Sequence, residues 1–152
     1  MEGLLVQNTE LSYTNGTAPM AGVDFEPNDP SHPLSGIVFD NVTAKGNAGR
    51  GFQWSLTASN TSTPPLEFTF VNCAVVGGGS YGVSISGSAH GGMPAGGHFN
   101  LTNISVTGSG GSGLLVEGKN GGATLHLDGV TLTNVGLDGG APVWVLAARI
   151  FL

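Results

Sequence analysis

The sequence has little charge, few basic residues and almost no cysteine. Only 9% of its 152 residues are charged, and 4 Lys and Arg stand against 10 Asp and Glu. So few cations would leave nucleic-acid phosphates unneutralised, which excludes nucleic acid as a partner. The single cysteine rules out an internal disulfide. Because Cys73 lies in an apolar strand pattern, we expect a buried, unreactive thiol.

Long apolar runs are also missing. The most apolar stretch, PVWVLAARIFL at residues 142–152, is too short to cross a membrane, so no membrane partner is expected. It has the pattern of one strand followed by the start of another. Because neither end carries a capping helix or a polar lid, we expect residues 1–152 to form a single domain that is a fragment of a longer repeat protein.

Glycine is plentiful, with 27 residues, and it accompanies an internal repeat. An apolar fraction of 39% is too high for a disordered chain, so the glycines predict tight corners. A corner residue between two apolar segments recurs at intervals of 33, 31, 31 and 26 residues, and a residue that opens a third segment recurs at intervals of 29, 31, 31 and 29. Two markers with one shared period indicate a repeat architecture. The corner residues are Asn8, Asn41, Asn72, Asn103 and Gly129, and the opening residues are Gly22, Gly51, Gly82, Gly113 and Pro142.

Apolar residues alternate within each repeat, which is the period of a β-strand. When the copies are aligned, each of the three segments contributes two columns that stay apolar in nearly every copy. Before the corner these are Leu4, Ile37, Phe68, Phe99, Leu125 and Val6, Phe39, Phe70, Leu101, Leu127. After the corner they are Val42, Cys73, Ile104, Val130 and Leu11, Ala44, Val75, Val106, Leu132. In the third segment they are Val23, Phe52, Val83, Leu114, Val143 and Phe25, Trp54, Ile85, Val116, Val145.

Stacked coils would bury all of these columns in one continuous core. The sequence therefore predicts an all-β parallel β-helix of about five coils with three strands per coil. Asn suits the corner because it tolerates left-handed backbone angles and its amide can hydrogen-bond along the stack. The alternative is an antiparallel β-sandwich, which would need hairpin turns between consecutive strands and would not produce one regular period.

The third segment also presents two rows of outward residues. The first row is polar and acidic toward the N-terminus and apolar toward the C-terminus, where Trp144 is placed either to stack on a sugar ring or to contact a further coil. The rows are Asp24, Gln53, Ser84, Leu115, Trp144 and Glu26, Ser55, Ser86, Glu117, Leu146.

The densest chemistry is in GVDFEPNDP, residues 22–30. Asp24 and Glu26 would point outward from one strand, with their Cβ atoms about 6.5–7 Å apart. That distance overlaps the roughly 6.5–9.5 Å between acid and base in inverting glycosidases. Two close carboxylates also raise the pKa of one of them, as a general acid requires. The pair is thus a catalytic candidate, and together with Asp29 it is a candidate calcium site. The plainer alternative is a solvated acidic surface.

Side chains near this pair are candidates for substrate binding. Gln53 and Ser55 follow on the next coil, with Arg50 in the turn that precedes them, and Asn28 belongs to the acidic stretch itself. Arg50 would orient a sugar hydroxyl or form an ordinary surface salt bridge. Two further candidates, His32 and His90, lie on loops two coils apart, a separation of roughly 10 Å that allows both to face one groove.

The coil pattern resembles the right-handed parallel β-helix of the pectin-lyase-like superfamily over essentially the whole chain. That resemblance implies a groove for carbohydrate chains, walled by long loops. Here the loops at 27–34, 57–65 and 87–97 would form the walls and the outward rows the floor.

Residues 22–52 further resemble mannuronan epimerases. Phe25 and Glu26 match the Phe and Asp of the family motif YGFDPH. Asn28 stands where that family has its catalytic His, and Val23 where it has its catalytic Tyr. Asn cannot transfer a proton as His does, so we do not expect the epimerase mechanism itself.

Together these patterns predict an extracellular or cell-surface β-helix that contacts a polysaccharide, as part of a polysaccharide lyase, glycoside hydrolase or epimerase. The alternative is a non-catalytic stalk or adhesin-like β-helix, and a third reading is a calcium-stabilised module. Long loops over one sheet favour the first. The acidic floor argues against a polyanionic substrate unless calcium bridges the two. No other cofactor is expected.

Overall fold

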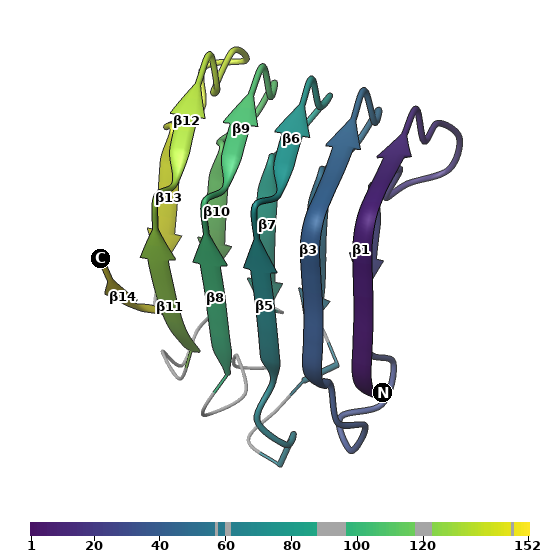
Figure 1. The fold of residues 1–152 in the computed structure, drawn as a ribbon. Helices are drawn as coiled ribbons and strands as arrows, with labels where there is room; N and C mark the ends of the chain where they lie inside the picture. The colour runs from purple at the N-terminus through teal and green to yellow at the C-terminus, as the bar shows by residue number, and fades with distance from the viewer. Residues whose placement is uncertain (57, 60–61, 88–96, 118–122, 147) are drawn as a thin grey trace.

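The computed structural model of the protein is all-β and describes residues 1–56, 58–59, 62–87, 97–117, 123–146 and 148–152. Figure 1 shows strands stacked side by side along one axis, with the two termini at opposite ends of the stack. The strands are β1 (Glu2–Ser12), β2 (Val23–Phe25), β3 (Ser35–Lys45), β4 (Phe52–Leu56), β5 (Glu67–Val71), β6 (Ala74–Val76), β7 (Val83–Gly87), β8 (His98–Thr102), β9 (Ser105–Thr107), β10 (Leu114–Glu117), β11 (Ala123–Asp128), β12 (Thr131–Thr133), β13 (Val143–Leu146) and β14 (Ala148–Phe151).

The strands form two parallel sheets. The first sheet has nine strands, in the order β12-β9-β6-β3-β5-β8-β11-β14 with β1 beside β3, and the second has five, in the order β13-β10-β7-β4-β2. Each strand pairs with its equivalent one layer along, and all the pairs are parallel. The structure is therefore a parallel β-solenoid, as predicted, and the antiparallel sandwich is excluded.

The number of turns and the division into strands differ slightly from the prediction. The second sheet has five strands and hence four steps from one layer to the next, which gives about four turns instead of five coils. Three separate strands per layer occur where β5 and β6, β8 and β9, or β11 and β12 precede a strand of the second sheet. β1 and β3 instead run through the corner as single strands of 11 residues.

The corners depend on left-handed backbone at fixed places. Asn8, Asn41, Asn72 and Asn103 have φ between 50° and 54°, and Gly129 continues the series at 63°. A second left-handed series, five residues further along in each layer, went unnoticed in the sequence because several residue types share it. Its members and their φ angles are Tyr13 (58°), Gly46 (59°), Gly77 (64°), Gly108 (74°) and Asn134 (51°).

The corner asparagines also bond along the stack. The Asn41 Nδ2 donates to Asn8 Oδ1 at 2.8 Å, and the Asn103 Nδ2 donates to Asn72 Oδ1 at 3.2 Å. Between these two pairs the ladder shifts by one residue, because the Asn72 Nδ2 donates to the Asp40 carboxylate at 3.4 Å. The predicted line of asparagines is thus confirmed, with one carboxylate inserted in it.

We expect Asn103→Ala to lower the free energy of unfolding about 1 kcal/mol more than Asn103→Gly. Both changes remove the side-chain bond to Asn72, but only alanine carries a Cβ that opposes the left-handed backbone. Urea unfolding of both variants measures the difference. Equal losses would show that the side-chain ladder, and not the backbone angle, is what asparagine supplies.

The predicted inward columns form the core. Their members in the middle layers are buried, and those in the end layers, such as Leu4, Val6 and Leu132, are half-buried because they have a neighbouring layer on one side only. Val143, in the last layer, is 47% exposed for the same reason. The alternation was therefore assigned to the correct face throughout the stack.

Aromatic rings fill the core of the first layers. The Phe39 and Phe70 rings stack with centroids 4.7 Å apart, and the Phe68 and Phe99 rings with centroids 5.5 Å apart. Trp54 points inward from the second sheet and meets Phe70 edge to face at 5.0 Å. Large rings offset or edge-on to one another bury much apolar area without strain, so this stack contributes strongly to stability.

Phe70→Ala should lower the free energy of unfolding by about 3–5 kcal/mol, because it removes a ring that is 1% exposed and leaves a cavity between Phe39 and Trp54. Val76→Ala is the matched control, since Val76 lies on the same layer but is 42% exposed, and it should change stability by less than about 0.5 kcal/mol. A loss below about 1 kcal/mol for Phe70→Ala would contradict the packing described above.

Candidate functional site

The acidic stretch lies at the N-terminal end of the second sheet. β2 alternates as predicted, so that the Phe25 ring is buried in the core while Asp24 is exposed on the outer face, and Glu26, the residue after β2, is also exposed. The Phe25 ring stacks on Trp54 of the next layer at 5.8 Å, which holds β2 in register with β4. Asp24 therefore projects from a strand that is fixed by the core beneath it, and Glu26 follows directly after that strand.

Asp24 is connected to a line of side chains that spans three layers. Gln53, its partner in register on β4, donates a hydrogen bond to the Asp24 carboxylate. The Gln53 side-chain Oε1 in turn accepts a hydrogen bond from the Arg50 Nη1. The Arg50 guanidinium lies over the Tyr81 ring, 5.5 Å from its centroid. The structure thus brings together three of the predicted site residues and adds Tyr81, which sequence reasoning missed.

The electrostatics of Asp24 follow from this position. Partial burial raises the pKa of its carboxyl above the ordinary value of 3.8, and the nearby Glu26 charge raises it further, while Gln53 and Arg50 oppose both effects. The Glu26 charge thus raises the pKa of Asp24 as expected, but burial raises it more. Arg50 acts on Asp24 only through space, because its guanidinium is directed to Gln53 and Tyr81.

The residues after Glu26 form a turn of their own. The Asp29 Oδ1 accepts hydrogen bonds from the Ser31 amide at 2.8 Å and the Ser31 hydroxyl at 2.7 Å, which lower the pKa of the Asp29 carboxyl. The Asn28 amide donates to the Glu26 carbonyl at 3.3 Å, and His32 is exposed. In the described part of the chain no three Asp, Glu, His or Cys side chains are grouped to hold a metal ion, and the calcium site of Asp24, Glu26 and Asp29 stays a prediction.

The outward row that includes Asp24 has the predicted register but not the predicted openness. Asp24, Gln53, Ser84, Leu115 and Trp144 are successive partners across the second sheet. Gln53 is 5% exposed, Ser84 0% and Leu115 4%, whereas Trp144 is 49% exposed. The Ser84 hydroxyl has no hydrogen-bond partner among the described residues. The outer face is therefore accessible at the two ends of this row and covered in its middle.

Ser55, His90 and the predicted loop walls add little to this description of the site. Ser55 is half-buried on β4, opposite Ser86 in register. His90 lies outside the described residues, as do parts of the loops at 57–65 and 87–97.

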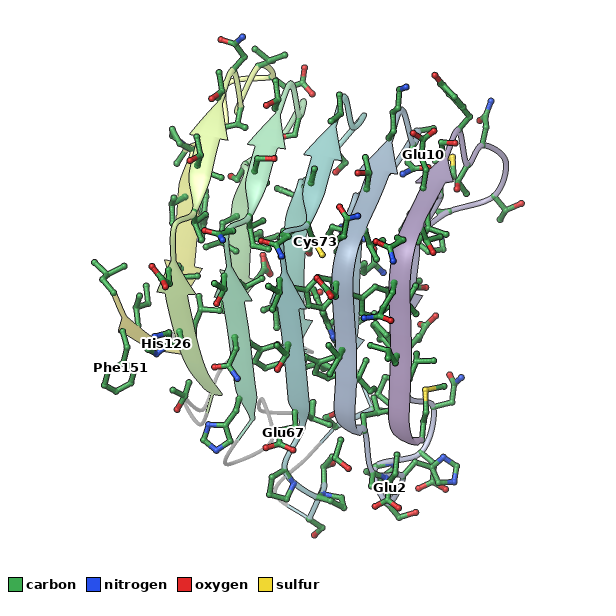
Figure 2. The ribbon with its side chains drawn as sticks, viewed as in Figure 1. Glu2, Glu10, Glu67, Cys73, His126 and Phe151 are labelled. Atoms are coloured by element: carbon green, nitrogen blue, oxygen red, sulfur yellow. The ribbon has the colours of Figure 1, made fainter. Side chains whose placement is uncertain are left out.

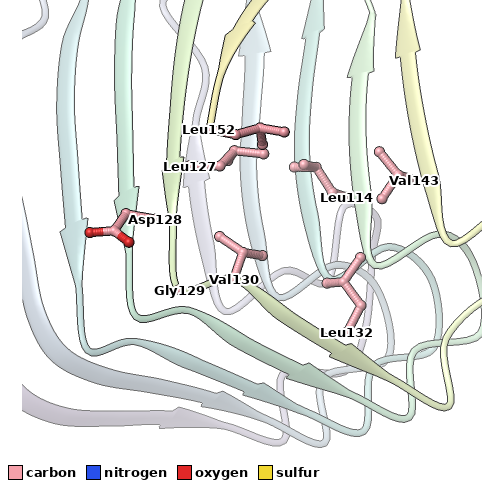
Figure 3. Close-up of a pocket in the computed structure, with 8 residues that line it drawn as sticks. All are labelled: Leu114, Leu127, Asp128, Gly129, Val130, Leu132, Val143 and Leu152. Carbon is pink, nitrogen blue, oxygen red and sulfur yellow. The ribbon is translucent and has the colours of Figure 1, made fainter.

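Apart from its outer face, the solenoid has a hollow at the C-terminal end of its core (Figure 3). The hollow has a volume of about 440 Å³ and is lined mainly by inward side chains of the last layers, including Leu127, Val130 and Leu132. The Asp128 side chain points away from this apolar group. This hollow is the end of the hydrophobic core, and it carries no chemistry.

A smaller pocket lies on the outside of the solenoid and was not predicted as a site. Its volume is about 250 Å³, and Tyr81, Ser112, Asp138 and Trp144 are among the residues that line it. Of these four, only Trp144 was considered in the sequence, because the others lie on three different turns whose approach depends on the stacking of layers.

Cys73 occupies the inward position expected of it. Figure 2 shows it within the stack of strands, where it is 1% exposed and where burial raises the pKa of its thiol. A thiol kept protonated and away from solvent is a poor nucleophile, so Cys73 is a core residue.

No protein-family model matches the chain, and neither a curated protein nor a solved structure matches it. Among the described residues there is also no helix long and apolar enough to cross a membrane. The structure by itself therefore shows a parallel β-solenoid whose corner asparagines hydrogen-bond to one another.

The opposite pKa shifts of Asp24 and Asp29 predict opposite effects of neutralising them. Because the pKa of Asp24 is higher in the folded than in the unfolded chain, its charge opposes folding at neutral pH, so Asp24→Asn should raise the Tm at pH 7. The gain should vanish as the pH falls through the folded pKa of Asp24 and below 3.8. Asp29→Asn should lower the Tm at pH 7, and that loss should vanish in acid below the depressed pKa of Asp29.

Thermal unfolding of both variants followed from pH 7 to pH 3 measures these differences. Effects of the same sign in the two variants would contradict the environments described for the two carboxylates.

Proposed function

We propose that this solenoid binds a polysaccharide on the outer face of its second sheet, as an extracellular or cell-surface protein of the pectin-lyase-like kind. The observation that carries the proposal is the line of polar contacts from Asp24 through Gln53 and Arg50 to Tyr81. It fixes an exposed carboxylate on β2, a cation in the turn before β4 and an aromatic ring in the turn before β7 relative to one another. Sites that recognise small polar ligands combine such groups.

The proposed ligand is a neutral chain. The protein has a formal net charge of −6, and its exposed carboxylates at this face would repel a polyanion. Asp24 and Glu26 are both exposed and would accept hydrogen bonds from sugar hydroxyls. The hydrogen bond from Gln53 fixes the Asp24 carboxylate, so less side-chain freedom is lost on binding.

A hydrolytic role for the same pair is the proposed extension. Asp24 lies in β2 and Glu26 directly after it. The Cβ atoms of residues i and i+2 of an extended chain lie about 6.5–7 Å apart, a spacing suited to a general acid and a general base with a water between them. The raised pKa of the Asp24 carboxyl fits the acid, which leaves Glu26 as the base. Asn28 and Val23 do not supply the His and Tyr of an epimerase.

A structural stalk is the second candidate, and two observations favour it. Neither pocket described above includes Asp24 or Glu26, and Gln53, the next residue of the row, is buried. A stalk needs the regular stacking of layers and no exposed polar site.

The test compares the chain with its Asp24→Asn/Glu26→Gln double variant, which keeps the shape of both side chains and removes their charge. Co-sedimentation with insoluble cellulose, xylan and mannan, and release of reducing ends from soluble forms, measure binding and cleavage. We expect the double variant to bind about tenfold or more weakly, since hydrogen bonds to charged groups are worth about 1.5–3 kcal/mol, and to lose any cleavage.

The matched control is Glu2→Gln/Glu10→Gln, which removes two exposed carboxylates from β1 in the other sheet (labelled in Figure 2) and should leave binding unchanged. If the chain binds none of these polysaccharides, or if the double variant behaves like the parent, the stalk becomes the better account.

A further inference from the structure

The pocket on the outside of the solenoid is built by three consecutive layers. Tyr81 lies just before β7 and Ser112 just before β10, while Trp144 is in β13 and Asp138 belongs to the turn that leads to it. Neighbouring strands of a sheet are about 4.8 Å apart, so the layers of Tyr81 and Trp144 are separated by roughly 10 Å. An aromatic side chain from each of these layers lines the pocket, with the layer of Ser112 between them.

Glycines leave room for the two side chains Tyr81 and Asp138. A Cβ on Gly111 would lie 3.0 Å from the Tyr81 ring, so the ring rests against a bare backbone. A Cβ on Gly110 would lie 2.7 Å from Asp138 Oδ2, so the carboxylate also approaches a position that only glycine leaves open. The layer between the aromatic residues therefore presents backbone and the Ser112 side chain, and no bulky group.

Tyr81 is held from the opposite side. Arg50 belongs to the layer before Tyr81, and its guanidinium lies over the ring at 5.5 Å. Gly111, Ser112 and Trp144 belong to the layers after it. The tyrosine is therefore fixed between an arginine and a glycine backbone, and it links the pocket to the line of contacts that begins at Asp24.

We propose that this pocket binds a single neutral pyranose unit, with Trp144 against the apolar face of the sugar, Tyr81 lining the pocket beside it and Asp138 accepting hydrogen bonds from its hydroxyls. The inference rests on the proposed function and extends it by one subsite on the same face of the second sheet. The pocket of about 250 Å³ is smaller than the roughly 300–1,000 Å³ of sites for drug-sized ligands, which suits one sugar unit of a longer chain.

The composition of the pocket selects this class of ligand. The Asp138 carboxylate would repel a uronate, and within the described ranges the pocket has no Lys or Arg among its lining residues to attract one. An ammonium ion would also be attracted to a carboxylate beside aromatic rings. Such a cation is usually bound in a closed cage of aromatic rings. Tyr81 and Trp144 come from layers roughly 10 Å apart and do not form a closed cage, which argues against a cationic ligand.

Intrinsic fluorescence offers a direct test, because the chain has two tryptophans in opposite environments. Trp54 is 1% exposed and Trp144 is 49% exposed, so acrylamide quenching reports chiefly on Trp144. Cellohexaose, xylohexaose, mannohexaose, oligogalacturonate and choline are the probes. We expect at least one of the neutral oligosaccharides to protect Trp144 from acrylamide, and oligogalacturonate and choline to give no protection.

Calorimetry then tests the individual side chains with the protecting oligosaccharide. Trp144→Ala and Tyr81→Ala should each weaken binding about tenfold, in line with the contribution of an aromatic contact, whereas Tyr81→Phe should bind like the parent. Asp138→Asn should weaken binding of the neutral sugar less than Trp144→Ala does, because the amide oxygen still accepts a hydrogen bond from a hydroxyl but lacks the charge that strengthens it. Phe151→Ala removes an aromatic ring of equal exposure, 50%, from β14 in the other sheet and should change nothing.

Three results would overturn the proposal: no neutral oligosaccharide protects Trp144, Trp144→Ala binds as tightly as the parent, or choline protects and Asp138→Asn abolishes that protection. Its failure is distinguishable from that of the proposed function. If polysaccharide binding depends on Asp24 and Glu26 but not on Trp144, the pocket is not a subsite and the binding face remains. If oligosaccharide binding depends on Trp144 but not on Asp24 and Glu26, the pocket binds sugar and the acidic end of the face does not.

Discussion

The left-handed backbone at the corners is the constraint on which the rest of the solenoid depends. Each layer bends twice at residues with positive φ, and the two bends lie five residues apart in every layer, from Asn8 and Tyr13 to Gly129 and Asn134. A polypeptide that bends at fixed intervals brings equivalent residues above one another, so parallel hydrogen bonds form between layers and not within them. Register, core columns and outward rows all follow from that repetition.

The same constraint explains which residues tolerate change. Inward positions must fill a column whose neighbours are only one strand spacing away, which is why rings such as Phe39 and Phe70 stack face to face in register. Outward positions carry no such requirement where the face is exposed. Asp24 and Trp144 occupy equivalent positions in the first and last layers, yet one is a carboxylate and the other an indole. The fold thus leaves its outer rows free to vary, and the proposed binding face uses these rows.

Most of the fold was predictable because its signals are local and repeated. Alternation and the period of the corner asparagines gave the strand order, the inward face and the register, and each agrees with the structure. The second corner series was readable at the same spacing of 33, 31, 31 and 26 residues, but Tyr, Gly and Asn share it, so no single residue type marked it. The burial of Gln53 and the pairing of Tyr81 with Trp144 in one pocket were not predictable, because they depend on side chains that meet across layers.

The contrast between the two ends of the outer row bears on how a ligand would lie. A chain bound along the solenoid axis would meet the exposed carboxylates of Asp24 and Glu26 at one end and the exposed Trp144 of β13 at the other, with Ser84 and Leu115 covered between them. Five strands about 4.8 Å apart span roughly 19 Å. A ligand that touches both ends must therefore be extended, and a monosaccharide would reach only one of them. Hydrogen bonding at the acidic end and apolar contact at the aromatic end are different kinds of recognition, so together they would select a polymer that offers hydroxyls and apolar ring faces along its length.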